Sequence, residues 1–148
     1  MFDRLLFICV GNICRSPMAE YWSKYQLQSF VPSVIVKSAG LGALKNFPVA
    51  PEVKLILDRY HIDTSMHRSQ KINAVLVGEA DIIFVMETWQ ARELSLAFPS
   101  VRGKIFLFGK WLKEEIQDPY RKEQLIFEQT FELIKLNWNE WQKRLWKN

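Results

Sequence analysis

The sequence predicts an α/β protein of three layers, with a central sheet of four parallel strands covered by helices on both faces. Short apolar runs rich in β-branched and aromatic residues, typical of buried strands, alternate along the chain with segments of helical periodicity. Strands that are separated by helices are joined by right-handed crossovers, which produce a parallel sheet. The 148 residues show no linker and no change in composition, so we expect one domain over residues 1–148.

The chain is expected to begin with a strand, a helix and a second strand. Residues 4–10 (RLLFICV) are apolar almost throughout, which predicts a strand buried on both faces. Ser16-Pro17 places a hydroxyl at a helix N-cap and a proline at the first helical position, where no backbone N–H is needed. Apolar side chains recur at helical spacing to about Gln28, and residues 34–38 (VIVKS) predict the next strand.

A loop rich in Gly and Pro over residues 39–51 follows, and loops of this length often carry function. The remaining elements are expected in this order: helices over residues 52–60 and 70–77, a strand over 81–86, a helix over 88–97, a strand over 104–108 and, after a loop through Asp118-Pro119, a helix over about 122–146. The last helix carries one apolar stripe, made of Ile126, Leu133, Ile134, Trp138, Trp141 and Leu145.

Composition excludes several classes of protein. Hydrophobic residues make up 49% of the chain and charged residues 24%, which excludes wholesale disorder. The net charge is only +4 and the basic residues are scattered until the C-terminal end, so we expect no nucleic-acid partner. No apolar run is long enough for a signal peptide or a membrane span, so we expect no membrane insertion and a cytoplasmic protein whose two cysteines are reduced.

The junction between the first strand and the first helix carries the chemistry. Parallel sheets bind ligands beyond the carboxyl ends of their strands, and this junction reads CVGNICRS over residues 9–16. A short loop that closes onto a helix N-terminus points successive backbone N–H groups inward and forms an anion site. Gly and Asn tolerate the backbone angles that so tight a turn needs. The residues expected to bind phosphate above the Cys9 sulfur are Val10, Gly11, Asn12, Ile13, Cys14 and Ser16.

This arrangement predicts nucleophilic phosphoryl transfer through a cysteinyl-phosphate intermediate. The loop amides and the helix dipole favour a thiolate at Cys9, and the guanidinium of Arg15 matches two phosphate oxygens. The hydroxyl of Ser16 is placed to donate to the sulfur. A cysteine in an apolar strand is more often a plain core residue, and the spacing between Cys9 and Arg15 alone does not exclude that. The position before a Ser-Pro sequence, with Gly-Asn in the turn, favours the catalytic interpretation.

Other ligand sites fit the sequence less well. The Walker pattern needs Lys-Ser or Lys-Thr after its glycines, and a dinucleotide fingerprint needs three spaced glycines where only Gly11 is present. The spacing of Cys9, Cys14, His61 and His67 matches no common zinc site. We therefore expect neither a metal nor another cofactor.

The run CVGNICRSP over residues 9–17 resembles the low-molecular-weight protein tyrosine phosphatases. The resemblance spans nearly the whole chain, because four further motifs fall in the order of that family: Ser38-Ala39-Gly40, His67-Arg68-Ser69, Met86-Glu87 and Asp118-Pro119-Tyr120. Within the family, SAGLGAL (residues 38–44) and DPYRK (residues 118–122) look like the bacterial branch tied to capsule and exopolysaccharide export.

The resemblance implies a role for each catalytic residue. Cys9 would be the nucleophile and Arg15 the clamp on the transition state. Asp118 would protonate the leaving phenol oxygen and then take a proton from the attacking water. Gln117 stands before the acid where many relatives carry proline, which would loosen the acid loop.

Further residues are assigned to the cleft and to the support of the loop. Tyr120 would form one wall of the cleft. Leu44 stands near the place where many relatives carry an aromatic wall, so a flatter and less aromatic entrance is expected. Asn12 would support the loop through hydrogen bonds that involve Ser38 and His67. Cys14 would either form a reversible disulfide with Cys9 or serve as a small residue.

The implied function is metal-free hydrolysis of phosphotyrosine in proteins. The implied partner is the tyrosine-rich tail of a membrane tyrosine kinase that controls polysaccharide export, and a monomer or weak dimer is expected. An arsenate reductase on the same fold would normally need further cysteines. A phosphotyrosine-binding module without activity would lack the acid or the nucleophile, whereas Cys9, Arg15 and Asp118 are all present.

Overall fold

The computed structural model describes residues 2–146, which form one parallel sheet and its covering helices. In chain order the elements are β1 (Arg4–Cys9), α1 (Arg15–Leu27), β2 (Ile35–Gly40), α2 (Pro51–Asp58), α3 (Ala74–Glu79), β3 (Ile82–Val85), α4 (Thr88–Ala97), the 3-10 helix η1 (Pro99–Lys104), β4 (Ile105–Leu107) and α5 (Gln124–Leu145). No helix within the described residues is both long and apolar enough to cross a membrane.

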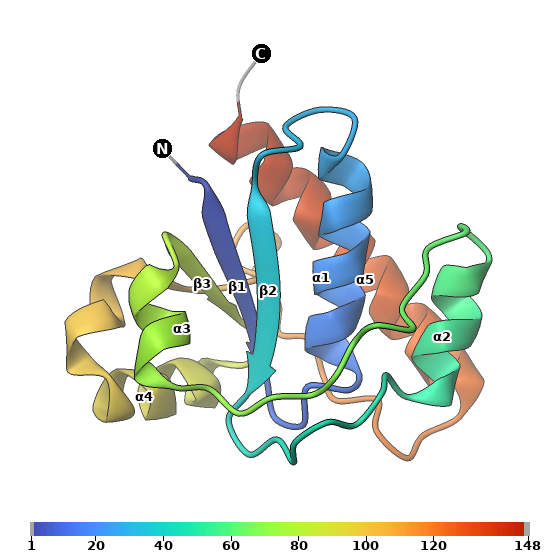
Figure 1. Ribbon diagram of the computed structural model, residues 1–148, viewed down its shortest axis with the longest axis horizontal. Coiled ribbons are helices and arrows are strands. Elements are labelled where there is room, and N and C mark those ends of the chain that lie inside the picture. The colour runs from blue at the N-terminus through green and yellow to red at the C-terminus, as the bar shows by residue number, and fades with distance from the viewer. Residues whose placement is uncertain (1, 147–148) are drawn as a thin grey trace.

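The four strands lie in the order β2-β1-β3-β4, and all three strand pairs are parallel. Helices α1, α2 and α5 cover one face of the sheet and α3 and α4 cover the other (Figure 1). The predicted three-layer α/β fold is therefore confirmed. Because β1 has β2 on one side and β3 on the other, the strand order reverses at β1. The carboxyl ends of the strands point toward the bottom of Figure 1, and there Cys9 is in register with Gly40.

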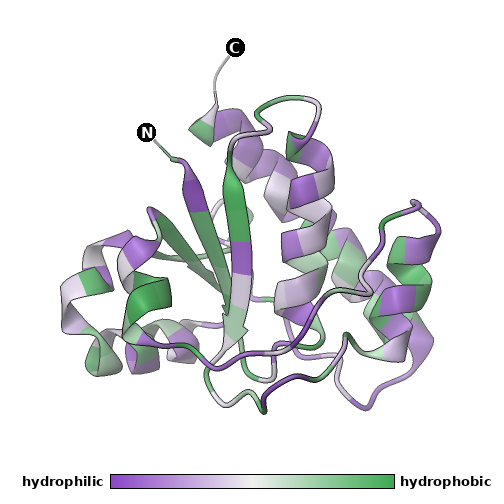
Figure 2. Cartoon of the chain, viewed as in Figure 1, coloured by the Kyte–Doolittle hydropathy of each residue, from purple (hydrophilic) through white to green (hydrophobic). Residues whose placement is uncertain are grey.

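Aromatic side chains fill the core between the sheet and α5. Phe7 on β1 is fully buried and stacks on Phe84 with ring centroids 4.9 Å apart. Its ring also contacts Phe108 edge-on at 5.3 Å and lies 6.4 Å from the ring of Trp138 on α5. β1 and β3 are apolar along most of their length in Figure 2, as expected for strands that are covered on both faces.

Two predicted helix starts are wrong. Helix α1 begins at Arg15, so Ser16 is not its N-cap, and the hydroxyl of Ser16 is engaged with Cys9 and Asn12 instead. The helix predicted from residue 70 begins at Ala74, where Asn73 caps it by accepting a hydrogen bond from the amide of Leu76. The residues before it are extended and pair with the end of β2, since Gly40 bonds to the backbone of residues 70 and 72.

The apolar stripe of the last helix is broader than predicted. Ile134, Trp138 and Trp141 are buried on α5, whereas Ile126, Leu133 and Leu145 are only partly buried. Phe127 and Phe131, which the predicted stripe omits, are buried among the core residues of the same face. The long loop begins one residue after Gly40, because β2 extends two residues beyond its predicted end.

Replacing Phe7 with alanine tests the importance of the aromatic core. We expect Phe7→Ala to lower the free energy of unfolding by about 3–5 kcal/mol, because a buried ring and its packing contacts are lost. Urea denaturation followed by circular dichroism measures this change. The exposed Phe2 provides a matched control, and Phe2→Ala should change stability by no more than about 0.5 kcal/mol. Equal losses in the two variants would contradict the packing described here.

Candidate active site

The loop between β1 and α1 forms the floor of a cavity of about 280 Å³ at the carboxyl edge of the sheet. The residues that line this cavity are Cys9, Val10, Gly11, Ile13, Cys14, Arg15, Gly42, Leu44, Phe47, Ser69, Asp118 and Tyr120. The structure thus brings the three predicted catalytic residues to one place, although more than 100 positions separate Arg15 from Asp118 in the sequence. Asn12 and Ser16, which are predicted among the phosphate-binding residues, are not among those that line the cavity; they are buried, as are the predicted support residues Ser38 and His67.

Asn12 sets the path of the loop. Its φ of 58° lies in the left-handed region, which asparagine tolerates better than most residues. The side-chain Oδ1 of Asn12 accepts a hydrogen bond from the amide of Gln70 at 3.0 Å. Its backbone oxygen lies 2.8 Å from Nε2 of His67, and because a carbonyl only accepts, that nitrogen carries the proton. The predicted support residues therefore contact Asn12 directly.

The end of β2 fits beneath this turn only because residue 40 is glycine. A Cβ at Gly40 would lie 2.3 Å from the backbone oxygen of Val10 and 3.1 Å from the amide nitrogen of Asn12. Backbone bonds also join the two segments, since Leu41 donates to the oxygen of Cys9 at 2.9 Å. The Ser38-Ala39-Gly40 motif thus holds the loop by close backbone approach.

A directed chain of hydrogen bonds ends at the Cys9 sulfur. The buried carboxylate of Glu20 only accepts, so Ser38 Oγ donates to it at 2.5 Å. The side-chain amide of Asn12 donates at 2.9 Å both to Ser38 Oγ and to Ser16 Oγ. Ser16 Oγ lies 2.9 Å from Cys9 Sγ, and its hydroxyl donates to that sulfur when Cys9 is a thiolate, which only accepts. The amide of Asn12 donates to the same sulfur at 3.3 Å. Two donors thus converge on the Cys9 sulfur and stabilise a negative charge there.

The guanidinium of Arg15 is fixed by two partners that the sequence analysis did not identify. Arg15 is only 1% exposed, and its Nη1 donates to Glu87 Oε2 at 2.6 Å and to the backbone oxygen of Ile116 at 2.8 Å. Nη2 faces the Asp118 carboxylate at 3.6 Å. Glu87 also caps α4. An acidic residue directly after a buried strand was the available signal for Glu87, because strand ends meet at one edge of the sheet.

The acid loop is anchored next to the expected proton donor. Ile116 donates its amide to the oxygen of Met86 at 3.0 Å, so the residue before Gln117 is held at the end of β3. The Asp118 side chain is 43% exposed and its Oδ1 accepts from the amide of Tyr120 at 3.1 Å. This turn places the carboxylate and the Tyr120 ring at the same cavity.

The entrance is more aromatic than the sequence analysis predicts. Leu44 lines the cavity as expected, but Phe47, three positions later, lines it as well. The expectation of a less aromatic entrance is therefore corrected: the cavity has two aromatic rings, Phe47 and Tyr120. Nothing in the local sequence separates Phe47 from an ordinary loop residue, because its position depends on contacts with a distant segment.

Cys14 differs from Cys9 in its surroundings, although both cysteines are buried and free. Burial raises the pKa of the Cys14 thiol far above its ordinary value, and the charges of Cys9 and Asp118 raise it further. Cys14 is thus held as a neutral thiol. Within residues 2–146, no group of three or more His, Cys, Asp and Glu side chains is placed to hold a metal ion, and His61 lies exposed after α2.

The fold and the site together define a class of protein: a phosphatase with a cysteine nucleophile below a strand–helix phosphate loop. A family model described as low molecular weight phosphotyrosine protein phosphatase matches residues 4–148. The chain belongs to this family and is a protein tyrosine phosphatase.

Individual relatives agree with this family. The chain is 39% identical to a probable low molecular weight protein-tyrosine-phosphatase, EpsP of Ralstonia solanacearum, over 98% of this chain and 97% of that protein. The tyrosine phosphatase Wzb of Escherichia coli K30, solved with sulphate, superposes with a TM-score of 0.89 at 34% identity and covers 99% of this chain and 100% of its own. A variant of the YwlE arginine phosphatase with a phosphorylated active-site serine superposes with a TM-score of 0.92 at 27% identity. The match covers 98% of this chain and 97% of the YwlE chain.

The raised pKa of Cys14 predicts selective alkylation. At neutral pH we expect iodoacetamide to label Cys9, whose sulfur lies against the hydroxyl of Ser16 and the amide of Asn12. Cys14 should stay unlabelled, because its raised pKa keeps it a neutral thiol. Near pH 8.5, the approximate pKa of an ordinary cysteine, Cys14 should react in the urea-unfolded chain but remain unlabelled in the folded protein. Fragment mass spectrometry of the peptide that carries both residues distinguishes the two positions. Equal labelling of Cys9 and Cys14 in the folded protein would contradict this assignment.

Proposed function

We propose that Cys9, Arg15 and Asp118 share the hydrolysis of phosphotyrosine in two steps. In the first, Cys9 Sγ attacks phosphorus, an S–P bond forms and the bond to the phenol oxygen breaks while Asp118 gives that oxygen a proton. In the second, water attacks phosphorus and gives a proton to Asp118. The S–P bond breaks, phosphate is released, and Cys9 is left as a thiolate. The observation that carries this proposal is the convergence of the thiol, the guanidinium and the carboxylate on one cavity.

The contacts of Cys9 support its role as the nucleophile. A thiolate needs hydrogen-bond donors, and the hydroxyl of Ser16 and the amide of Asn12 supply two of them. The same donors stabilise the sulfur when it leaves phosphorus in the second step. The solved YwlE variant carries its phosphoryl group on a serine of the active site, which is the corresponding kind of intermediate in a related protein.

The anchoring of Arg15 supports its role as the clamp. Glu87 and Ile116 hold Nη1, which leaves Nη2 directed toward Asp118 at the cavity. Phosphate bound over residues 10–16 would present two oxygens to this fork, and the charge on those oxygens in the transition state is what a fixed guanidinium stabilises. The phosphate-binding set consists of Val10, Gly11, Asn12, Ile13, Cys14 and Ser16, with Leu44 and Tyr120 at the entrance.

The exposure of Asp118 supports its double role. Its carboxylate lies beside the guanidinium but remains 43% exposed, so it reaches both the leaving oxygen and solvent water. A buried carboxylate would serve the first step and exclude the water of the second. Tyr120 follows in the same turn and contacts the substrate ring.

The cellular substrate in this proposal is the phosphorylated, tyrosine-rich tail of a membrane tyrosine kinase that controls capsule or exopolysaccharide export. The motifs SAGLGAL and DPYRK support the assignment to this branch. Arg121 and Lys122 are exposed beside the acid and favour the approach of a phosphorylated, acidic segment. The proposed location is the cytoplasm, where the free thiols of Cys9 and Cys14 stay reduced, and the proposed state is a monomer or weak dimer.

Replacing the acid tests the proposed chemistry. With EDTA present, we expect the wild type to hydrolyse phosphotyrosine peptides faster than phosphoserine or phosphoarginine peptides, and Cys9→Ser to be inactive. Asp118→Asn should lower kcat/KM, which reports the steps up to release of the leaving group, by about 10²–10⁴-fold on the phosphotyrosine peptide because general acid catalysis is lost. The loss should be smaller with p-nitrophenyl phosphate, whose leaving group needs no proton.

The matched control for the acid is Asp63, which is exposed and bonds to the amide of Ser65 as Asp118 bonds to that of Tyr120. Asp63→Asn should leave kcat unchanged. Equal losses of kcat/KM of Asp118→Asn on both leaving groups would show that Asp118 is not the proton donor. A preference for phosphoarginine would overturn the proposed substrate.

A further inference from the structure

A second cavity, of about 590 Å³, has no role in the proposed chemistry. It opens between α1, the edge strand β2 and the segment between α2 and α3, which passes in front of α1 in Figure 1. Ser38 and His67, which contact Asn12 in the phosphate loop, belong to its lining, so this rear cavity lies behind that loop. Its volume is typical of ligand sites, which range over about 300–1,000 Å³.

One stretch of backbone separates the rear cavity from the active-site cavity. Arg68 lines the rear cavity, whereas the next residue, Ser69, lines the cavity above Cys9. The Cα atoms of consecutive residues are about 3.8 Å apart, so the two cavities lie on opposite sides of one chain segment. A peptide that crosses this segment would enter both cavities.

The lining of the rear cavity carries an excess of positive charge. Arg68 is exposed and its Nη1 donates to two backbone oxygens of its own segment, but it forms no ion pair within residues 2–146. Lys24 on α1 also lines the cavity, with its side chain 44% exposed and its ammonium group 2.5 Å from Glu20. Lys37 adds a third cation, 3.8 Å from Glu79. Against these cations the lining holds one carboxylate, that of the buried Glu20, so the cavity attracts anions.

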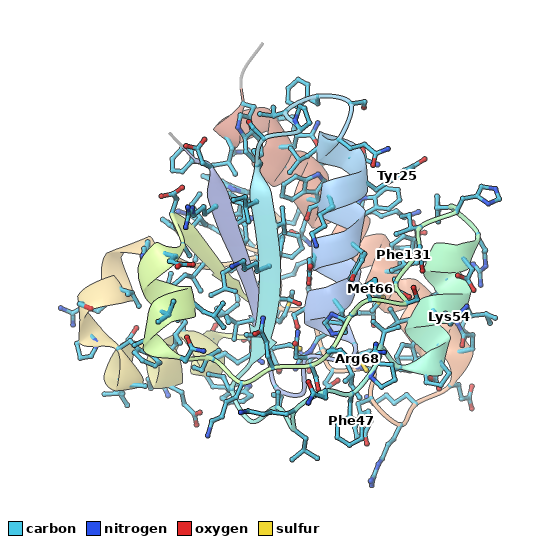
Figure 3. All side chains as sticks on the ribbon, in the orientation of Figure 1. Tyr25, Phe47, Lys54, Met66, Arg68 and Phe131 are labelled. Atoms are coloured by element: carbon cyan, nitrogen blue, oxygen red, sulfur yellow. The ribbon has the colours of Figure 1, made fainter. Side chains whose placement is uncertain are left out.

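The remaining lining offers apolar surface for a ring. Met66 comes two positions before Arg68 on the same segment, as Figure 3 shows, and is 84% exposed. Tyr21 on α1 is only partly buried, and its ring lies edge-on to that of His67 with centroids 6.1 Å apart. Thioethers and aromatic rings both pack favourably against a further ring. The rear cavity thus combines apolar contacts with positive charge, and a phosphotyrosine combines a ring with about two negative charges.

We propose that the rear cavity binds a second phosphotyrosine of the substrate tail while the first lies above Cys9. This inference rests on the proposed function and deepens it, since a tyrosine-rich tail offers several sites of phosphorylation. Arg68 would bind the second phosphoryl group, and Met66 and Tyr21 would contact its ring. None of the described residues that line the rear cavity is a cysteine, so this group is bound there and not transferred. Two contacts on one peptide raise the effective concentration at each site and strengthen the binding of the tail.

The test compares peptides that carry one phosphotyrosine with peptides that carry two. Cys9→Ala lacks the nucleophile, so calorimetry with this variant measures binding without turnover. The two phosphotyrosines are separated by spacers of about two, four or six residues, which span increasing distances. We expect the best of these peptides to bind about tenfold more tightly than the singly phosphorylated one, whereas two independent phosphotyrosines at one site would give about twofold.

Removal of the proposed anchor should abolish this advantage. In the Cys9→Ala background, Arg68→Ala should reduce it to about twofold and leave the Kd of the singly phosphorylated peptide unchanged. Arg68→Lys keeps a charge but not the planar fork, so it should retain part of the advantage. A phosphoserine in place of the second phosphotyrosine should weaken binding about threefold, because the ring contacts are lost. Arg102→Ala removes an exposed arginine outside both cavities and should change neither affinity.

Three outcomes would overturn the proposal. A gain of no more than about twofold at every spacer would show that the rear cavity does not bind the second phosphotyrosine. An equal weakening of both peptides by Arg68→Ala would show that the substitution only disturbs the phosphate loop. An equal loss in Arg102→Ala would show unspecific attraction by charge. A chain with Cys9 intact that binds the doubly phosphorylated peptide through Arg68 but hydrolyses neither peptide would instead refute the proposed function and leave the second site established.

Discussion

The site depends on one turn of the backbone between β1 and α1. Asn12 in this turn has the left-handed conformation, which directs the chain from the end of β1 to the start of α1. The turn is held from three sides: His67 bonds to its carbonyl, Gln70 to its side-chain oxygen, and Gly40 leaves room for the approach of β2. The cost of the conformation is offset by these contacts. The side chain of Asn12 also contacts Ser16, which lies against the Cys9 sulfur, so one residue shapes the loop and positions the hydroxyl next to that sulfur.

A buried positive charge connects the remaining parts of the site. Arg15 is enclosed by protein, and an uncompensated guanidinium in that position would be costly. Glu87 at the end of β3 and the carbonyl of Ile116 compensate it, and through Ile116 the arginine also contacts the acid loop. Arg15 and Asp118, the proposed clamp and acid, therefore belong to one connected set of contacts, and Ser16, the residue after Arg15, lies against the Cys9 sulfur. Arg15, Glu87 and Asp118 are far apart in the sequence, but the folded parallel sheet brings them together at its carboxyl edge.

The strands and the phosphate loop could be predicted because their signals are local. The apolar run before Cys9 and the tight turn through Gly11 and Asn12 are read directly from neighbouring residues. The start of α3 could not be predicted from the sequence, because residues 70 and 72 form backbone hydrogen bonds with Gly40 instead of belonging to the helix. The contact of Glu87 with Arg15 and the position of Phe47 at the cavity were missed for a related reason: their partners, Arg15 and Ser69, are far away in the sequence.

The central claim is that the phosphoryl group is transferred to Cys9 before it is released as phosphate. Trapping this cysteinyl-phosphate intermediate tests the claim most directly. Asp118→Asn lacks the base of the second step but can still complete the first step with p-nitrophenyl phosphate, whose leaving group needs no proton. The variant mixed with this substrate and quenched in denaturant should therefore accumulate one phosphoryl group per chain. Fragment mass spectrometry should place that group on Cys9 and not on Ser16, Cys14 or Tyr120. Release of phosphate from p-nitrophenyl phosphate with no phosphorylated Cys9 at any quench time would contradict the mechanism.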